Sequence, residues 1–422
     1  MKSLRIIMFT TFYPPYSFGG DAVGVQRMAQ ALVNRGHDVT VVHDIDAFLT
    51  MGGTPPTAPV PIDGVKAIGL QSRHNVLSNL LTQQLGRPVV HSARIKAILD
   101  EGHYDIIWHN NTSLVGGPGL LDMGSSLKIY EAHEHWLVCP MHVLWRYNKE
   151  LCDAKECLRC TLSFKRPPQL WRYTGLLDKK LDQIDLLIAK SSFSKEMHKK
   201  FGLRQDMTVL PYFLPDMDLK DMPDPAQHER PYFLFVGRLE KIKGLQDVFP
   251  AFDKYPDADL LILGDGEYSE ELKALAAGND RIKFLGRKPL DELTAYYRGA
   301  LGLIVPSVCY ETFGIILIES FRLGTPVIAR KLGPFPEIVE KSEGGVLYEA
   351  EDELINAMKT IQSDPDWRAT HGAAARRGFE DYWSEGSVLK AYGAELAKAA
   401  HSRGDAVLAK AFEAGAFEHG VG

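Results

Sequence analysis

Two glutamates lie eight residues apart in the otherwise largely apolar stretch "PSVCYETFGIILIES". The stretch follows a predicted strand, and the residues from Gly314 onward favour a helix that starts near Phe313. The free N–H groups at such a helix start attract an anion. Glu311 would precede the anion, and Glu319 would lie about 8 Å further along at roughly 1.5 Å per residue from Gly314. Because carboxylates accept hydrogen bonds from hydroxyls and repel phosphates, the stretch suits a ligand with hydroxyls at both ends and phosphates between them.

Cations and glycines follow two earlier predicted strands of the same half of the chain. "GRLEKIKG" places Arg238 and Lys243 in a loop that Gly244 closes, and two cations beside a flexible turn suit a diphosphate. "GDGEY" places Gly264 and Gly266 where a ligand can approach the backbone closely. Taken singly, the first loop is also typical of a solvated charged loop and the second of an ordinary turn. Together with the two glutamates, they indicate a nucleoside diphosphate sugar as the ligand.

These residues must be positioned by strands, and the sequence contains two series of short apolar strand candidates. The first is "LRIIMFT", "DVTVVH", "YDIIWHN", "LKIYEAH" and "DLLIAKSS", and the second begins at "FLFVGR" and ends at "GGVLYE". Continuous apolar runs that alternate with helical segments predict parallel sheets of α/β type. Such doubly wound domains bind ligands at the carboxyl ends of their strands. A proline-rich, charged segment separates the series, and predicts domains over 1–214 and 215–384.

Composition limits the class of protein further. The chain has 422 residues, 45% apolar and 24% charged, with a formal charge of −6. These values predict a globular protein of two domains and argue against a nucleic-acid partner. No run reaches the length of a membrane span, and we expect a cytoplasmic protein. The mixed basic and aromatic segment "FKRPPQLWRY" is typical of an exposed helix start, and peripheral contact with a membrane or an acidic acceptor is its alternative.

Several motifs, in this order and spacing, resemble the GT-B fold glycosyltransferases of family 4. They are "GRLEKIKG", "LILGDGEY", "FLGRKP" and "PSVCYETFGIILIESFRLGTPVIARKLGPFPEIV", preceded by "FYPPYSFGGDAVGVQRMAQALVNRGHDVTVV" and "YEAHEHW". The resemblance spans roughly residues 4–385 and is looser over 45–100. It implies two Rossmann-like domains that face each other. It also implies that helices over about 385–405 pack back on the first domain, which leaves residues 406–422 as a tail.

The resemblance also implies roles for individual residues. Arg238 and Lys243 would hold the diphosphate, Glu311 would bind hydroxyls of the donor sugar, and Glu319 would bind the ribose. His133 of "YEAHEHW" would contact the donor sugar, although a lone histidine is more often structural. The remaining contacts implied for the donor are Gly19 and Gly20 at the reaction centre, Gly264 near the ligand, the backbone near Arg287 at the base, and the backbone of Thr312, Phe313, Gly314 and Ile315 at the sugar and phosphate.

Two departures from the family pattern stand out. Glu134 replaces the commoner aspartate after His133, and Tyr212-Phe213 replaces the usual Asn-Gly turn before the linker.

The reaction that the resemblance implies is transfer of a sugar, with UDP-sugar as the expected donor, to an acceptor hydroxyl with retention of configuration. The leaving phosphate would help to take the acceptor's proton, and Glu311 need not be a covalent nucleophile. No catalytic metal or other cofactor is expected, because the cations and the helix start stabilise the leaving group. No motif in the sequence identifies the acceptor. A catalytically silent nucleotide-sugar-binding subunit is one alternative, and a GT-B epimerase or phosphorylase is another.

Four of the five cysteines gather within the segment "CPMHVLWRYNKELCDAKECLRC". A structural zinc site has four ligands, and this segment offers four thiols: Cys139, Cys152, Cys157 and Cys160. The short spacing between Cys157 and Cys160 is also typical of such sites. Reduced thiols are the simpler interpretation, and disulfides or an iron–sulfur cluster are further alternatives. If a metal is present, we expect it to brace the loop after His133 without contacting the reacting bond.

Overall fold

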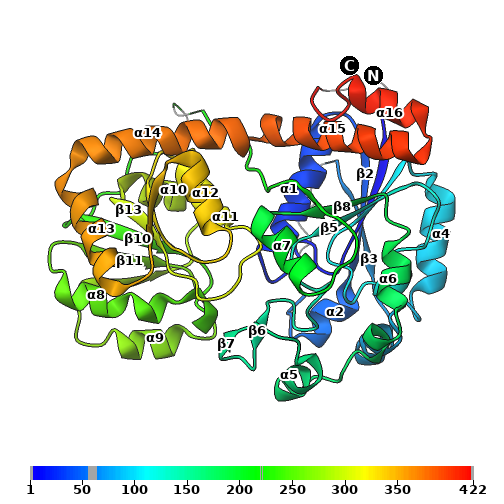
Figure 1. The fold of residues 1–422 in the computed structure, drawn as a ribbon, viewed down its shortest axis with the longest axis horizontal. Helices are drawn as coiled ribbons and strands as arrows, with labels where there is room; N and C mark the ends of the chain where they lie inside the picture. Colours follow the sequence, from blue (N-terminus) through cyan, green and yellow to red (C-terminus); the bar gives the residue numbers. More distant parts are fainter. Residues whose placement is uncertain (1–2, 56–63, 219, 221, 420–422) are drawn as a thin grey trace. The chain divides into compact units, whose positions relative to one another are not determined.

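The computed structural model describes residues 3–55, 64–218, 220 and 222–419 of the chain. It divides the chain into two compact units. Unit 1 comprises Met1–Pro211 and Val388–Gly422, and unit 2 comprises Tyr212–Ser387. Each unit contains a parallel β-sheet with helices packed against it, so the predicted α/β class is confirmed (Figure 1).

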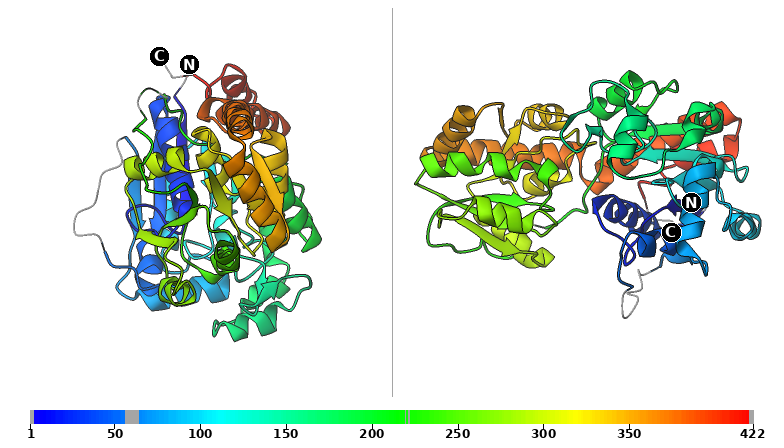
Figure 2. Two further views of the ribbon diagram at one scale, coloured as in Figure 1. Left: turned by 90° about the vertical axis from the view of Figure 1, so that its left-hand side faces the viewer. Right: turned by 90° about the horizontal axis from the view of Figure 1, so that it is seen from below.

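The sheet of unit 1 has seven parallel strands in the order β3-β2-β1-β4-β5-β8-β9. The central strands β1 and β4 are mainly apolar and, apart from Arg5, buried, because helices cover both faces of the sheet, as the views in Figure 2 show. In this order, the strand bounds are β3 (Lys66–Leu70), β2 (Asp38–Asp44), β1 (Arg5–Thr10), β4 (Ile106–His109), β5 (Leu127–Ala132), β8 (Leu186–Ala189) and β9 (Thr208–Val209).

The helices of unit 1 come from both ends of the chain. Their bounds are α1 (Gly20–Asn34), α2 (Ile45–Thr50), α3 (Asn75–Leu85), α4 (Ser92–Gly102), α5 (Cys157–Ser163), α6 (Leu176–Leu181), α7 (Ser192–Lys200), α15 (Glu385–Arg403) and α16 (Ala406–Glu413). A small hairpin of β6 (Trp145–Arg146) and β7 (Glu150–Leu151) lies apart from the main sheet.

Residues 406–422 were predicted to be a tail, and the part that the structure describes instead packs into unit 1. Asp405 caps α16 by accepting a hydrogen bond from the backbone N–H of Leu408. Phe417 is fully buried and stacks on Trp108. Nε2 of His37 lies 2.6 Å from the carbonyl oxygen of Ala416. The alanine-rich composition of this segment did not indicate that Phe417 would be buried and would hold this end of the chain in unit 1.

The sheet of unit 2 has six parallel strands in the order β12-β11-β10-β13-β14-β15. In this order, their bounds are β12 (Ile282–Gly286), β11 (Asp259–Leu263), β10 (Tyr232–Val236), β13 (Gly302–Val305), β14 (Val327–Arg330) and β15 (Gly345–Tyr348). The helices are α8 (Phe249–Lys254), α9 (Ser269–Leu275), α10 (Leu290–Gly299), α11 (Ile315–Arg322), α12 (Phe335–Ser342), α13 (Glu351–Ser363) and α14 (Pro365–Tyr382).

The strand register of unit 2 brings the carboxyl ends of its strands to one edge. Val236 pairs with Leu263, and Leu263 pairs with Gly286, so β10, β11 and β12 end side by side. The loops that carry the predicted donor residues leave from this edge. In the described part of the chain, no helix is both long and apolar enough to cross a membrane.

Candidate active site

Three loops at the carboxyl edge of unit 2 are bound to one another through their backbones. The N–H of Leu239, after β10, donates to the carbonyl of Asp265 at 3.0 Å. The N–H of Val308, after β13, donates to the carbonyl of Ile242 at 2.9 Å. These bonds join the loops 237–244, 264–266 and 306–314 into one surface, as expected for a ligand site at the strand ends.

Lys243 and Glu311 form the charged centre of this surface. Lys243 Nζ donates to Glu311 Oε1 at 2.6 Å, and Ser307 Oγ donates to the same oxygen at 3.1 Å. Burial opposes both charges, but Lys243 holds the pKa of Glu311 below its usual value, and Glu311 holds the pKa of Lys243 above its own. The pair therefore stays ionised at neutral pH and presents one cation and one carboxylate to a ligand.

Helix α11 starts at Ile315, two residues later than predicted, with Gly314 as its N-cap. No side chain caps its first turn, so the backbone N–H groups of that turn can receive an anion. Glu319 lies within this helix as predicted and accepts a hydrogen bond from Tyr297 Oη at 3.3 Å. Phe313 is buried, and its ring packs on Tyr212 at 5.7 Å between centroids. Only its backbone is therefore suited to contact a ligand.

The remaining predicted residues of unit 2 lie at the same edge but are less enclosed. Arg238 forms an ion pair with Glu240 at 2.7 Å, and its side chain is 56% exposed. Arg287 is exposed and directly follows β12. Gly264 has a φ of +148°, and its N–H donates to the carbonyl of Gly286 at 2.9 Å. All three positions thus lie at the carboxyl edge of the sheet of unit 2.

Gly244 holds the loop of Lys243 against the loop that carries Ser307. Its φ is +69°, and a Cβ atom would come closer than 3.0 Å to the carbonyl oxygen of Pro306. Gly278, also in unit 2, has a φ of +96° with nothing within 4 Å of such an atom.

We therefore expect Gly278→Ala to cost about 1 kcal/mol through backbone strain alone. Gly244→Ala should cost about 2 kcal/mol more, because the loops must separate to admit the methyl group. Urea unfolding of both variants measures the difference. Equal losses would show that the two loops do not depend on this close approach.

In unit 1, His133 directly follows β5 and its side chain is only 1% exposed. Its Nε2 lies 2.9 Å from Asn110 Oδ1 and 3.8 Å from Glu131 Oε1. Glu134, which replaces the commoner aspartate, pairs with Nδ1 of His142 at 2.7 Å. The two residues of the His-acidic pair thus point to different partners, and the contact of His133 with a sugar remains a prediction.

Gly19 and Gly20 lie at the start of α1. Gly19 is the N-cap in extended conformation, and no side chain caps the helix. A Cβ atom on Gly20 would meet nothing within 4 Å. There is thus space beside Gly20, and the role of the two glycines at the reaction centre stays a prediction.

A buried ion pair in unit 1 escaped the sequence analysis. Lys190 after β8 pairs with Glu131 of β5, and their side chains are 1% and 4% exposed. Glu131 also accepts hydrogen bonds from Tyr392 Oη at 3.0 Å and Trp108 Nε1 at 2.8 Å. Burial opposes the charge of Glu131, but Lys190 keeps the pKa of that carboxyl below its usual value. The sequence feature that could have indicated this ion pair is a charged residue at the end of each of two apolar strands.

Comparison with known proteins places both units in glycosyltransferase families. The model named Glycosyltransferase Family 4 matches residues 18–214, and the model named Glycosyl transferases group 1 matches residues 218–378. Together with the fold, these matches show that the chain belongs to the GT-B glycosyltransferases of the family 4 type. It is accordingly an enzyme.

The relatives found by sequence comparison match this chain over different lengths. The sulfoquinovosyl transferase SQD2 of Arabidopsis thaliana is 33% identical over 162 residues, which cover 37% of this chain and 31% of that protein. The chain thus matches about a third of that relative's length. A glycogen synthase of Mycobacterium tuberculosis is 25% identical over 395 residues, which cover 89% of this chain and 90% of that protein.

Solved structures share the fold at low identity. The sucrose-phosphate synthase of Thermosynechococcus elongatus superposes with a TM-score of 0.72 at 20% identity, over 94% of this chain and 100% of that one. Anabaena HepE in complex with UDP superposes with a TM-score of 0.66 at 17% identity, over 94% and 100% of the two chains.

Proposed function

We propose that the protein transfers a sugar from a nucleoside diphosphate sugar to an acceptor hydroxyl, and that the carboxyl edge of unit 2 binds the donor. The observation that carries this proposal is the ionised pair of Lys243 and Glu311 beside the uncapped start of α11. A diphosphate needs cations and N–H groups, and a sugar needs hydrogen-bond acceptors. The surface offers these groups next to each other.

Each group of the surface has a distinct part in the proposed reaction. Lys243 and Arg238 neutralise the diphosphate, and the first N–H groups of α11 donate to its oxygens. Glu311 accepts hydrogen bonds from the donor sugar, and Glu319 accepts them from the ribose. The negative charge that develops on the leaving diphosphate meets groups that are already oriented, which stabilises the transition state.

The donor base and the stereochemistry are finer parts of the proposal. UDP-sugar is the proposed donor, because structures of HepE with UDP and with UDP-glucose share this fold. Retention of configuration follows from the family resemblance, with the leaving phosphate taking the acceptor's proton. In unit 1, His133, Gly19 and Gly20 are proposed to act on the donor sugar and the acceptor. Cytoplasmic location stays a prediction, and a structural zinc at the four cysteines is a separate proposal that takes no part in this reaction.

A panel of nucleoside diphosphate sugars, incubated with the purified protein, tests the proposal. Release of the nucleoside diphosphate from one donor, faster than without protein, would support it. Each donor is first checked by thermal shift, because a ligand of the folded state raises the midpoint of unfolding. A donor that stabilises the protein but is never cleaved, with any hydroxyl acceptor tried, would support the silent binding subunit instead.

Lys243→Ala should weaken binding of the free nucleoside diphosphate by about tenfold or more, because a charge-assisted contact is lost. Lys241 is the matched control, since it lies on the same short 3-10 turn but is exposed. The thermal shift produced by a fixed concentration of nucleoside diphosphate should shrink in Lys243→Ala and persist in Lys241→Ala. Equal shifts in both variants would argue against the diphosphate site.

A further inference from the structure

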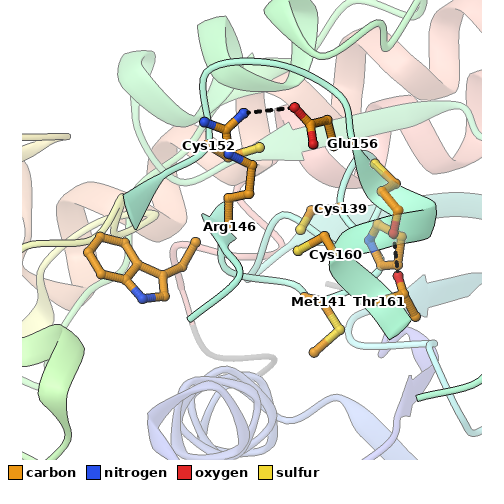
Figure 3. A pocket seen from close by; sticks show the side chains of 10 residues that line it. Cys139, Met141, Arg146, Cys152, Glu156, Cys160 and Thr161 are labelled. Carbon is orange, nitrogen blue, oxygen red and sulfur yellow. Dashed lines mark hydrogen bonds and ion pairs between the residues drawn. The ribbon is translucent and has the colours of Figure 1, made fainter. Parts of the chain in front are cut away.

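The segment from Cys139 to Cys160 belongs to unit 1, and the proposed reaction assigns none of its residues a role. It contains the hairpin β6–β7 and the first residues of α5. All four of its cysteines are free, and all four line one cavity (Figure 3). We propose that this cavity is a structural zinc site with Cys139, Cys152, Cys157 and Cys160 as its four thiolate ligands.

The cavity has the size of a site for one ion. Its volume is ≈ 20 Å³, and besides the four cysteines it is lined by Pro140, Met141, Trp145, Arg146, Glu156 and Thr161. A cavity needs roughly 10–15 Å³ to hold one water molecule, so this one accepts a single atom or ion and excludes an organic ligand. Four thiols around one small cavity suit a soft or borderline cation.

A backbone N–H group points at one of the sulfur atoms. The N–H of Tyr147 donates to Cys160 Sγ at 3.5 Å. Such a bond is stronger to a thiolate than to a thiol, so it suits a metal-bound sulfur.

The four thiols line the same cavity, so their thiolate forms would repel each other in the absence of a cation. A bound Zn²⁺ reverses this effect, because it neutralises charge and releases the thiol protons on binding.

The sulfur atoms must still move together to form a closed site. Zn–S bonds of about 2.3 Å place tetrahedral sulfurs about 3.8 Å apart. Among the described residues, only Asp44, Asp46 and His91 bring three ligand atoms within 4.8 Å of one another, so the four sulfurs stand further apart. Cys152, Cys157 and Cys160 are only partly buried, which leaves their side chains room to rotate towards the cavity.

The cluster of Asp44, Asp46 and His91 is less suited than the cysteines to bind the ion. Asp46 Oδ2 lies 2.9 Å from His91 Nε2, and its Oδ1 accepts from the N–H of Ser72 at 2.9 Å. Asp44 Oδ1 accepts from the N–H of Ala47 at 3.0 Å as the N-cap of α2. These oxygens are already used in holding α2 and α4 to the strands, whereas the cysteines line an open space.

The segment has little else to hold it in place. Apart from Cys139, only Leu144 and Trp145 between residues 139 and 160 are buried. Short segments with so small a core usually depend on a disulfide or a metal. Arg146 contributes ion pairs to Glu150 at 3.0 Å and Asp153 at 2.9 Å, but the acidic partners are exposed. A four-thiolate metal centre would supply the missing constraint.

Elemental analysis of full-length protein, purified without chelator, tests the site. We expect about one equivalent of zinc per chain. Cys160→Ser should lose most of it, and Cys309→Ser should keep it, since Cys309 is the one remaining cysteine and is buried in unit 2. Less than about a tenth of an equivalent in the parent would overturn the proposal, and so would stoichiometric iron or disulfides found by mass spectrometry.

A second measurement does not depend on how the variants fold. A mercurial reagent added to the native parent protein should release zinc to a colorimetric chelator in step with modification of the four thiols. Zinc that stays bound after all four have reacted would show that its ligands lie elsewhere. Zinc release should also lower the midpoint of thermal unfolding, because the metal binds only the folded segment. An unchanged midpoint would contradict the structural role.

Discussion

Glu311→Gln should reduce turnover by on the order of 10² to 10³ fold while the fold is retained. The amide keeps the size of the side chain and can still accept from Ser307, but it no longer offers a charged acceptor to the donor sugar. It also leaves Lys243 without its carboxylate partner. The cation can then bind ground-state phosphate as before, so the loss should appear mainly in kcat.

The measurement is the initial rate of donor cleavage under saturating donor, together with the circular dichroism spectrum and the unfolding midpoint. Glu340→Gln is the matched control, because Glu340 is an exposed glutamate on α12 of the same unit. A Glu311→Gln enzyme that turns over at the parent rate would remove Glu311 from the proposed site.

Glu131→Gln should destabilise unit 1 by about 3–5 kcal/mol, because it leaves the buried Lys190 ammonium without its countercharge. Glu131 also joins β5 to α15 through Tyr392, so α15 should lose protection together with the sheet. Denaturant unfolding gives the free energy, and hydrogen exchange reports which elements open.

Two further variants distinguish the effect of losing the buried ion pair from general destabilisation of unit 1. Asp100→Asn removes a charge from an exposed pair with Lys96 in the same unit and should change the transition little. The double variant Glu131→Gln with Lys190→Met removes both buried charges and should be more stable than Glu131→Gln alone. A double variant no better than the single one would show that the pairing is not what stabilises these strands.

The sequence could place most of the residues proposed to bind the donor at one edge of unit 2, because Arg238, Lys243, Gly264, Arg287 and Glu311 each follow the end of an apolar strand by a few residues. The run before Lys243 and the run before Glu311 are both continuous and apolar, and parallel strands bring their carboxyl ends to one edge. The sequence therefore specifies the neighbourhood without any knowledge of pairing. It did not specify that Lys243 and Glu311 contact each other, since 68 residues separate them.

Unit 1 shows what sequence patterns alone could not predict. Glu131 and Lys190 lie on different strands, and Tyr392 approaches them from a helix 202 residues after Lys190. Such contacts depend on tertiary packing, which local periodicity does not record. The same holds for Phe417, whose burial against Trp108 gave no signal in an alanine-rich end.

The start of α11 was misplaced by two residues for a local reason. Thr312 and Phe313 are compatible with a helix, but Gly314 adopts a φ of +139° and ends the preceding loop. Phe313 is thereby directed into the core of unit 2. Helix boundaries depend on such single dihedral angles, whereas the existence of the helix follows from its apolar pattern.

The central claim is that unit 2 binds the diphosphate of a sugar nucleotide at Lys243 and the start of α11. Calorimetric titration of the parent protein with UDP and with UMP tests it most directly, because the two ligands differ only in the second phosphate. We expect one UDP site per chain, with UMP binding about tenfold or more weakly, since the second phosphate supplies the charge-assisted contacts. Equal affinity for UDP and UMP would contradict the account.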